Sequence, residues 1–555
     1  MTGGQAIVSA LVEHGVDTVF GIPGTHNLEI YRHLAKLGVR HVNTRHEQGA
    51  GYAADGYART TGRVGVAVVT TGPAVLNAST ALAQSWSDSV PVLLISPGMP
   101  LRHPALGNGL LHEARDQQAA LAAVGAASLR VTSVEEIPTA VAQAFALMLG
   151  GRPRPVHLEV PLDVLAEVAE ITEAAQGGFM VPLVLPRSVP DACVVAAAVE
   201  RLVDAERPVV LVGGGAKGAA DELREFVELL GAAVVTTTNG KGVLPEDHPL
   251  ALGAGIHLPA VRALVEDADV VVAIGTELAP ADLWYGPLPL AGKLVRIDVD
   301  PVALITNARP DVAVVGDAAV VLVSLTRVLK GPDVATDAGA AAGTKGGSER
   351  EAVIARSRER KQADARAEGA EWLGIVDALE SCLPRDIIVS ADNAMACYYG
   401  AVTNLATYTP GSFLFPTGFG TLGYGLPAAI GAKVGNPDRP VLAMLGDGGV
   451  MFTVQELAAA ADLGLALPVV VIDNSGYGEI RNEMLDRDDP VHAVTFGGTD
   501  FAALGRSMGC HGRTITDAAE LASAVVAALA EDRPTVIHLL MSPDPTHSAT
   551  ERDDA

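Results

Sequence analysis

The chain has 555 residues, 49% of them apolar, and its 65 acidic against 39 basic residues give a formal net charge of −26. That length exceeds one hydrophobic core and predicts two to four domains, while the acidic balance argues against nucleic acid or an anionic membrane as partner. No apolar run approaches membrane-spanning length, and four scattered cysteines without metal-type spacing favour a reducing, cytoplasmic location.

The first block of the chain, residues 1–165, alternates short β-rich runs with helical stretches. The β-rich runs are DTVFGIPG, RVGVAVVTTG, VPVLLISPG and PVHLEVP. Alternation of strands and helices is typical of α/β folds with parallel sheets and right-handed crossovers. We therefore predict an α/β domain with a central parallel sheet.

A second block, residues 188–330, repeats this rhythm with RPVVLVGGGA, AAVVTTTNGKG, ADVVVAIGTEL and KLVRIDVDP. The glycines at 213–215 follow a strand and could indicate a dinucleotide site, but a Gly-rich turn after a strand is common, and an ordered G-x-G-x-x-G with a matched acidic residue is not convincing here. We interpret this block as a structural spacer domain. Residues 331–351, rich in Gly, Ala and Thr, predict a flexible linker, and the polar tail 546–555 is predicted to be mobile.

The third block, residues 352–545, carries the most informative segment. Gly446-Asp447-Gly448 follows the apolar run VLAML and precedes a helix-like stretch, and the run PVVVID then ends just before Asn474. Glycines let the backbone approach a phosphate closely, and a helix N-terminus offers unpaired N–H groups. Asp447 and Asn474 are hard oxygen donors at the ends of two strands. They suit a Mg²⁺ ion that holds a diphosphate.

Gly-Asp-Gly, followed by 25 residues (449–473) and an asparagine, resembles the signature of thiamine-diphosphate (ThDP) enzymes. Over nearly the whole chain, the order of the blocks is similar to that of the acetolactate synthase / pyruvate decarboxylase branch. The resemblance implies three α/β domains: pyrimidine-binding, central and Rossmann-like, and diphosphate-binding. It also implies Asp447 and Asn474 as side-chain Mg²⁺ ligands and Gly476 as a backbone-carbonyl ligand.

Glu47, in RHEQGAGYAADGYAR, is the candidate catalytic carboxylate. In ThDP chemistry a carboxyl group exchanges a proton with the pyrimidine ring of the cofactor, so it must lie in an apolar, water-poor pocket. The alternative is a glutamate that the helix dipole favours at a helix start. The HEQGA-type motif of the family favours the catalytic role.

The resemblance extends to residues that contact the cofactor. Leu422, in PTGFGTLGYGLPAA, corresponds to a bulky apolar wedge beneath the bent ThDP, with an ordinary core leucine as the alternative. The implied cofactor contacts are Glu47, Gly72, Pro73, Asn77, Asn393, Ala394, Met395, Thr421, Leu422, Gly446, Gly448, Gly449 and Tyr477.

Four further residues lie on loops that face the thiazolium ring in relatives. His26 and Gln117 are the candidate catalytic residues among them, and Thr25 and Thr71 are candidate substrate contacts. A histidine there can relay protons or bind the substrate carboxylate near neutral pH. The alternative for the segment PGTHN is a turn and helix start, with Thr25 as the cap.

The segment YGEIRNEMLDRDD differs from acetolactate synthases, which carry methionine and tryptophan where this chain has Glu479 and Glu483. Carboxylates there would suit a cationic substrate tail, with Asp392 as a third contributor. The alternative is that both glutamates lie exposed on a surface helix, paired with neighbouring arginines. Together with PTGFGTLGYGLPAA, this segment looks most like 5-guanidino-2-oxopentanoate (2-ketoarginine) decarboxylases.

These observations predict a ThDP- and Mg²⁺-dependent decarboxylase of a small-molecule 2-oxo acid, with an enamine intermediate and a guanidino acid as candidate substrate. The resemblance implies a homodimer or homotetramer with its active site at the subunit interface. FAD occupies the central domain of some relatives, but GTELAPADLWYG lacks their Arg-Phe-Asp-Asp-like run, which favours a domain without FAD. Three alternatives stay open: an acetolactate-synthase-like carboligase, a flavin-linked 2-oxo acid oxidase and a non-catalytic ThDP-binding scaffold.

Overall fold

A computed structural model describes residues 1–104, 107–170, 185–331 and 347–541. Within these residues the strands form three six-stranded sheets, in which all neighbouring strands are parallel. Helices on both faces bury the sheets, which explains the near-continuous Val-rich runs. The predicted α/β fold class is confirmed. None of the described helices combines the length and apolar character that a bilayer crossing requires.

The first sheet has the strand order β2-β1-β3-β4-β6-β5. Its strands are β1 (Thr18–Gly21), β2 (Arg40–Asn43), β3 (Gly65–Val68), β4 (Val92–Gly98), β5 (Ala127–Arg130) and β6 (Val156–Pro161). The helices of this unit are α1 (Gly3–Glu13), α2 (Leu28–Leu34), α3 (Glu47–Thr61), α4 (Pro73–Asn77), α5 (Ser79–Ser87), α6 (Gln117–Ala122), α7 (Ile137–Leu149) and α8 (Leu162–Ala166).

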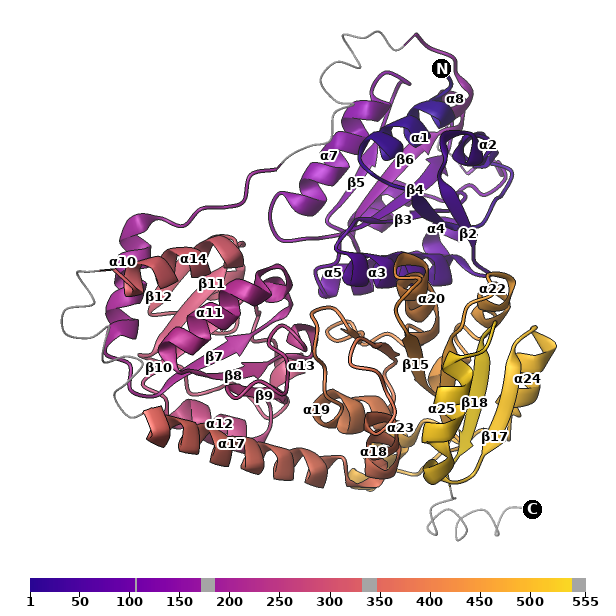
Figure 1. The fold of residues 1–555 in the computed structure, drawn as a ribbon. Coiled ribbons are helices and arrows are strands. Elements are labelled where there is room, and N and C mark those ends of the chain that lie inside the picture. The colour runs from indigo at the N-terminus through magenta and orange to yellow at the C-terminus, as the bar shows by residue number, and fades with distance from the viewer. Residues whose placement is uncertain (105–106, 171–184, 332–346, 542–555) are drawn as a thin grey trace.

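The second sheet has the order β12-β11-β10-β7-β8-β9. Its strands are β7 (Pro208–Val212), β8 (Ala233–Thr236), β9 (Ala251–Ala254), β10 (Val270–Ile274), β11 (Leu294–Asp298) and β12 (Val312–Val315). Its helices are α10 (Ala192–Val203), α11 (Ala220–Leu230), α12 (Pro259–Asp267), α13 (Pro280–Leu283) and α14 (Ala318–Leu329). Of the predicted linker, residues 332–346 lie outside the described residues, and helix α17 (Gly347–Glu368) follows. It runs from the second unit to the third along one side of the molecule (Figure 1).

The third sheet has the order β14-β13-β15-β16-β18-β17. Its strands are β13 (Ile388–Ala391), β14 (Phe413–Leu414), β15 (Val441–Gly446), β16 (Pro468–Asp473), β17 (His511–Ile515) and β18 (Thr535–Leu540). Its helices are α18 (Leu373–Glu380), α19 (Val402–Asn404), α20 (Gly425–Gly435), α21 (Asp447–Val450), α22 (Glu456–Asp462), α23 (Gly478–Asp486), α24 (Phe501–Ser507) and α25 (Leu521–Leu529). The predicted mobile tail 546–555 lies outside the described residues.

The first and third units pack through helices α3 and α20, which lie against each other in Figure 1. A Cβ atom on Gly431 would lie 1.9 Å from the carbonyl oxygen of Ala53, and one on Gly56 would lie 2.2 Å from that of Ala428. Only glycine permits such close contact between the two backbones. Buried apolar residues of both units form one continuous cluster, so these units share a core.

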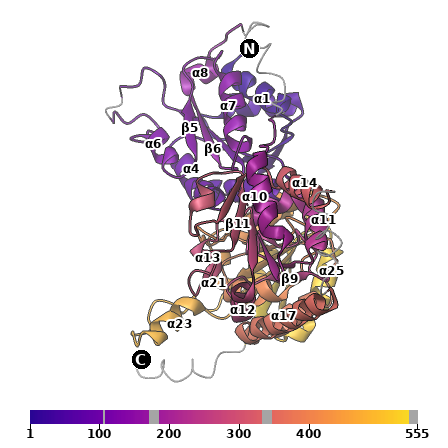
Figure 2. The ribbon, with the colours of Figure 1, turned by 90° about the vertical axis from the view of Figure 1, so that its left-hand side faces the viewer.

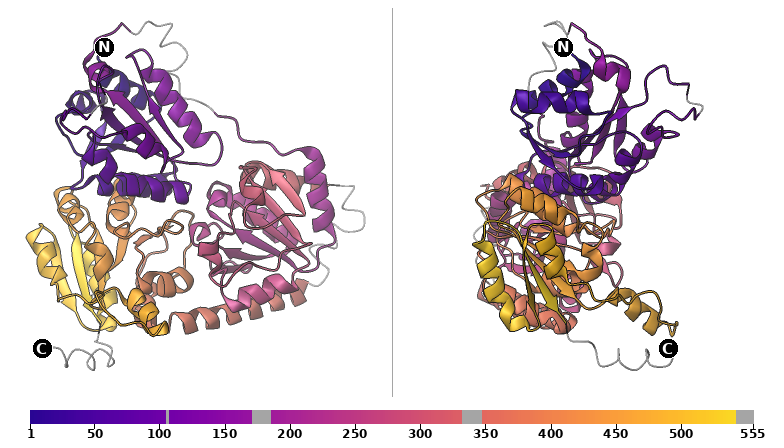
Figure 3. Two further views of the ribbon diagram at one scale, coloured as in Figure 1. Left: turned by 180° about the vertical axis from the view of Figure 1, so that it is seen from behind. Right: turned by 90° about the vertical axis from the view of Figure 1, so that its right-hand side faces the viewer.

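The three units lie next to one another, as the view from behind in Figure 3 shows. Arg59, near the end of α3, forms hydrogen bonds with residues of all three. Its guanidinium donates to Asp55 at 2.6 Å, to Asp88 at 2.7 Å and to Asn239 of the second unit at 3.1 Å. Tyr424 of the third unit donates its hydroxyl to Asp55 at 2.7 Å. Because Arg59, Asp55 and Asp88 are almost fully buried, an unpaired charge on any of them would be strongly unfavourable.

Candidate functional site

Three neighbouring strands of the third sheet end beside one another and precede the predicted diphosphate and metal residues. β13, β15 and β16 are adjacent and parallel, so their carboxyl ends share one edge of the sheet. The turn 392–395 follows β13, Asp447 opens α21 directly after β15, and Asn474 follows β16. Crevices at the carboxyl ends of parallel strands are the usual ligand sites of such sheets.

The three predicted metal ligands converge at this edge. The side-chain oxygen of Asn474 lies 3.0 Å from the carbonyl oxygen of Gly476 and 3.2 Å from Oδ1 of Asp447. Octahedral Mg²⁺ with ligand distances of 2.0–2.1 Å separates adjacent oxygens by about 2.9 Å. With the amide turned over, its nitrogen would instead donate hydrogen bonds to both oxygens. The donor set therefore fits a small divalent cation.

Backbone geometry explains the glycine at position 476. Gly476 has φ of +152°, and Ser475 before it has φ of +63°. A Cβ atom on Gly476 would lie 2.0 Å from the carbonyl oxygen of Val494. Any side chain there would displace the loop that presents the Gly476 carbonyl.

The electrostatics of this edge also favour a cation. Asp447 is 4% exposed, and burial, followed by repulsion from Asp473, raises its pKa to about 7. Burial would raise the pKa of Asp473 too, but the 2.8 Å hydrogen bond with His538 and that from the Ser475 N–H outweigh it and lower that pKa. A divalent ion beside Asp447 would favour its ionised form.

The turn after β13 is fastened by Asp392, which is fully buried. Its carboxylate accepts hydrogen bonds from the N–H groups of Asn393 at 2.8 Å, Gly423 at 2.9 Å and Gly425 at 3.4 Å. Burial raises the pKa of Asp392 to about 6 against these bonds. Asn393 donates from its amide to the carbonyl of Thr421 at 2.9 Å. Asp392 therefore supports its own loop, and its predicted substrate contact stays a prediction.

Close contacts group the other predicted cofactor residues of the third unit. A Cβ atom on Gly446 would lie 3.0 Å from that of Ala394, and one on Gly448 would lie 2.8 Å from the Tyr477 ring. The sulfur of Met395 lies beside the glycine that follows Tyr477. The structure thus brings together Asn393, Ala394, Met395, Gly446, Gly448, Gly449 and Tyr477.

Thr421 and Leu422 lie in the loop before α20. The hydroxyl of Thr421 is hydrogen-bonded to that of Tyr52 on α3, so the first unit holds this loop. Thr421 is buried and Leu422 is half-buried. Leu422 therefore retains surface for a ligand to contact.

Glu47 is the first residue of α3 and is half-buried. The N–H of Gln48 donates to Nδ1 of His46, which caps the helix at 3.2 Å. Asn77, the last residue of α4, donates its amide to Oε2 of Glu47 at 3.0 Å. Helices α3 and α4 together orient the Glu47 carboxylate.

Glu456, which sequence reasoning missed, holds the segment before Glu47. Its carboxylate accepts hydrogen bonds from the N–H of Arg45 at 3.0 Å and from that of His46 at 2.9 Å. Burial raises the pKa of Glu456 to about 7, although these bonds oppose the shift. The sequence ELAAAAD of α22 does not distinguish Glu456 from an exposed glutamate at a helix start, because its burial follows from the fold.

His26 and Thr71 meet at the carboxyl edge of the first sheet. Nδ1 of His26 lies 2.6 Å from Oγ1 of Thr71, and the ring of His112 lies 5.1 Å from that of His26. Burial, followed by repulsion from His112, lowers the pKa of His26. Thr25 is exposed.

Gln117 is committed to contacts within its own unit. Its Oε1 accepts from the N–H of Gly72 at 2.9 Å, and its Nε2 donates to Ser96 Oγ and to Glu159 Oε2, each at 3.0 Å. Gly72 has φ of +60°, and a Cβ atom there would lie 2.3 Å from the carbonyl oxygen of His112. Gln117 thus fixes the turn that leads into Pro73.

Helix α23, which carries Glu479 and Glu483, projects from the rest of the molecule (Figure 2). Glu479 is half-buried and accepts a hydrogen bond from the hydroxyl of Tyr399 at 2.8 Å. Glu483 is exposed. Glu479 therefore contacts the body of the chain through this side-chain hydrogen bond.

Comparison with family models gives three matches in the order of the units. Residues 1–124 match the N-terminal TPP binding domain of thiamine pyrophosphate enzymes, residues 195–325 the central domain, and residues 394–539 the C-terminal TPP binding domain. Thiamine pyrophosphate is another name for ThDP.

Full-length relatives agree with these matches. The chain is 43% identical to the probable 2-ketoarginine decarboxylase AruI of Pseudomonas aeruginosa, over 97% of this chain and 94% of that protein. It is 31% identical to a probable acetolactate synthase large subunit of Methanocaldococcus jannaschii (98% and 92% covered). It is 34% identical to the acetolactate synthase large subunit of Corynebacterium glutamicum (98% and 87% covered). The predicted resemblance and the prediction of an enzyme are confirmed: the chain belongs to the thiamine pyrophosphate enzyme family.

Proposed function

We propose that this protein decarboxylates a 2-oxo acid with a cationic tail, 5-guanidino-2-oxopentanoate being the leading substrate, with ThDP and Mg²⁺ as cofactors. The observation that carries the proposal is the 43% identity, over almost the whole chain, to a protein named as a probable 2-ketoarginine decarboxylase. The oxygens that converge at the edge of the third sheet support the choice of cofactors.

Each candidate residue has a defined task in this proposal. When bound, ThDP supplies a thiazolium carbon that adds to the 2-oxo group and accepts the electrons released with CO₂. Asp447, Asn474 and the carbonyl of Gly476 would hold Mg²⁺ and, with it, the diphosphate. Glu47, oriented by Asn77, would hold the proton that it shares with the pyrimidine ring.

The remaining residues act on shape and on the substrate. Leu422 would support the bent cofactor through contact alone. His26, whose lowered pKa favours the neutral ring at pH 7, would hydrogen-bond the bound acid together with Thr71. Gln117 would act indirectly, because it holds the turn at Gly72.

We propose a homo-oligomer whose active site lies between subunits. Large apolar side chains next to the candidate cofactor residues are exposed in the single chain: Leu76 (42%), Phe419 (52%), Met451 (49%) and Phe452 (47%). Apolar groups clustered around a site favour coverage by a partner surface. A cytoplasmic location is part of the proposal, and the four free cysteines fit it.

The second candidate function is an acetolactate-synthase-like carboligase, which the relatives of 31% and 34% identity favour. Product analysis separates the two. We expect 4-guanidinobutanal and CO₂ from 5-guanidino-2-oxopentanoate, and little turnover of pyruvate. Acetolactate from pyruvate, without aldehyde from the guanidino acid, would contradict the decarboxylase. A yellow absorbance of the purified protein would instead favour a flavin-dependent enzyme.

A further inference from the structure

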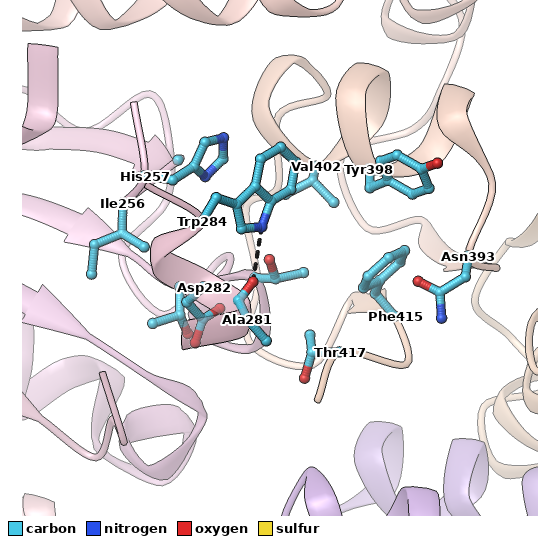
Figure 4. A pocket seen from close by; sticks show the side chains of 13 residues that line it. Ile256, His257, Ala281, Asp282, Trp284, Asn393, Tyr398, Val402, Phe415 and Thr417 are labelled. Atoms are coloured by element: carbon cyan, nitrogen blue, oxygen red, sulfur yellow. Dashed lines mark hydrogen bonds between the residues drawn. The ribbon is translucent and has the colours of Figure 1, made fainter. Parts of the chain in front are cut away.

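A cavity of about 140 Å³ lies between the second and third units (Figure 4). Loops that follow β9 and β10 form one wall, and the segments around α19 and β14 form the other. The side chains used below are His257, Asp282 and Trp284 from the second unit, and Asn393, Tyr398 and Phe415 from the third. This volume suits the end of a substrate side chain.

Aromatic rings make up much of the cavity and its surroundings. The indole of Trp284 stacks on His257, with ring centroids 4.0 Å apart and planes inclined by 18°. Tyr399 meets Trp284 edge-on at 5.7 Å, and Tyr398 meets Tyr399 at 4.6 Å. The faces of such rings attract cations, and tryptophan attracts them most strongly.

Trp284 is held in an unusual backbone conformation. Its φ of +38° is rarely adopted by a bulky side chain and costs on the order of 1–3 kcal/mol. A hydrogen bond of 2.9 Å from the indole Nε1 to the carbonyl of Ala281 fixes the ring at the cavity, as the dashed line in Figure 4 shows. The surrounding contacts therefore hold the indole at the cavity in spite of this strain.

Asp282 adds a carboxylate without a counter-ion. Burial, followed by repulsion from Asp88 and Glu277, raises its pKa to about 7. Within the described parts of the chain, no Lys or Arg forms an ion pair with it. A half-buried carboxylate of this kind at a cavity gains from a cation that also donates hydrogen bonds.

The cavity adjoins the candidate cofactor site through Asn393. This residue lines the cavity, while its amide donates to the carbonyl of Thr421, directly before Leu422. A 2-oxo acid whose carbonyl lies above Leu422 could therefore extend its tail past Asn393 into the cavity. The tail end would then meet Trp284 and Asp282.

We propose that this cavity is the specificity pocket for the guanidinium end of the substrate, with Asp282 as its counter-ion and Trp284 as its stacking surface. The inference rests on the proposed function, since it assumes a guanidino 2-oxo acid. A guanidinium group is planar, stays charged and donates in a fork that matches a carboxylate. The second unit then recognises substrate and is more than a spacer.

The first test compares variants of the holoenzyme on two substrates. For Asp282→Asn we expect kcat/KM on 5-guanidino-2-oxopentanoate to fall about 10- to 100-fold, mainly through KM, because a charge-assisted hydrogen bond is lost. Activity on 2-oxohexanoate, which lacks the cation, should change less than about threefold. Asp267 is an exposed carboxylate of the same unit, so Asp267→Asn is the matched control, and its kcat/KM on both substrates should equal that of the wild type.

A second test measures binding to the wild type, so it does not depend on whether Asp282→Asn folds. Trp284 is one of three tryptophans, so propylguanidine bound over its indole should change the intrinsic fluorescence of the wild type, and Trp284→Phe should lose that change. Propylguanidine should also compete with the guanidino substrate. Absence of both effects, or an unchanged KM in Asp282→Asn, would overturn the pocket assignment. A wild type that does not decarboxylate the guanidino acid would instead overturn the proposed function.

Discussion

Replacing Arg59 by Met should destabilise the whole chain, because this residue neutralises two carboxylates where the three units meet. The side chains of Arg59, Asp55 and Asp88 are 2%, 0% and 1% exposed. Removing one partner of a buried ion pair typically costs 3–5 kcal/mol. We expect a loss of about 4 kcal/mol, which corresponds to a fall in Tm of about 10 °C for a cooperative unit of 150–250 residues.

The loss should depend on pH in a defined direction. Burial would raise the pKa of Asp88, but Arg59 lowers it in the wild type. Without Arg59, burial dominates, so folded Asp88 binds a proton at a pH where the unfolded chain does not. The stability of Arg59→Met should therefore decrease as pH rises, and its deficit should be larger at pH 8 than at pH 5. Burial, followed by repulsion from Arg59, lowers the pKa of Lys217 to about 8. Because the variant lacks this repulsion, Lys217, which Asp88 attracts, would offset part of this loss.

Thermal unfolding of the holoenzyme at pH 5 and pH 8 checks both points. Arg63→Met is the matched control, because Arg63 pairs with Asp17 on the surface, where the side chains are 43% and 58% exposed. That pair should contribute less than about 1 kcal/mol. Equal Tm losses in the two variants, or an Arg59→Met deficit that is the same at both pH values, would refute the reasoning.

Four further predictions concern cofactor chemistry, packing and acid stability. Glu47→Gln should bind ThDP and Mg²⁺ as the wild type does in calorimetry but lose about 10²–10⁴-fold in kcat, and wild-type turnover would remove Glu47 from its role. Asp447→Ala should weaken cofactor binding at least 10- to 100-fold, and wild-type affinity would remove Asp447 from its role. Gly431→Ala should lower the unfolding free energy by about 1–3 kcal/mol or more, because its Cβ would lie 1.9 Å from a carbonyl oxygen; an unchanged Tm would contradict that contact. Burial lowers the pKa of His157 to about 3, so as pH falls this histidine is protonated in the unfolded chain before it is protonated in the folded one. The free energy of unfolding, measured by urea denaturation, should therefore drop by about 2 kcal/mol between pH 7 and pH 5. His157→Gln should reduce this dependence on pH.

Residues at the edge of the third sheet were predictable because each follows an apolar strand directly. In a parallel sheet, Asp447 and Asn474 must then end on the same edge, whatever the details of the loops. Local sequence thus specifies such positions without knowledge of the tertiary fold. Glu47 differs, because its place at a helix start also fits a glutamate that the helix dipole favours, and its catalytic role is predicted from the HEQGA-type motif of the family.

Contacts between distant segments could not be read in this way. Gln117 carries the polarity of a pocket residue, yet its amide is used by Gly72, Ser96 and Glu159, which only the fold brings near it. The same limit applies to Glu456, which holds the start of α3 from more than 400 positions along the chain. Side-chain type indicates what a residue can do, and packing determines which partner uses it.

In the central unit, the glycine-rich turn after β7 is distinct from the residues proposed to take the substrate tail. The glycines at 213–215 approach the backbone and side chain of residues 275–276 and the side chain of Asn239, so their small size is explained by packing within the unit. The proposed substrate contacts lie instead in the segment after β10, where Trp284, with φ of +38°, and Asp282 line the cavity that the third unit also borders. Because α17 and the contacts of Arg59 fix the central unit against the other two, this unit can form one wall of a pocket. Selection of the substrate tail by one unit and activation of the cofactor by the others is the division of labour that these positions support.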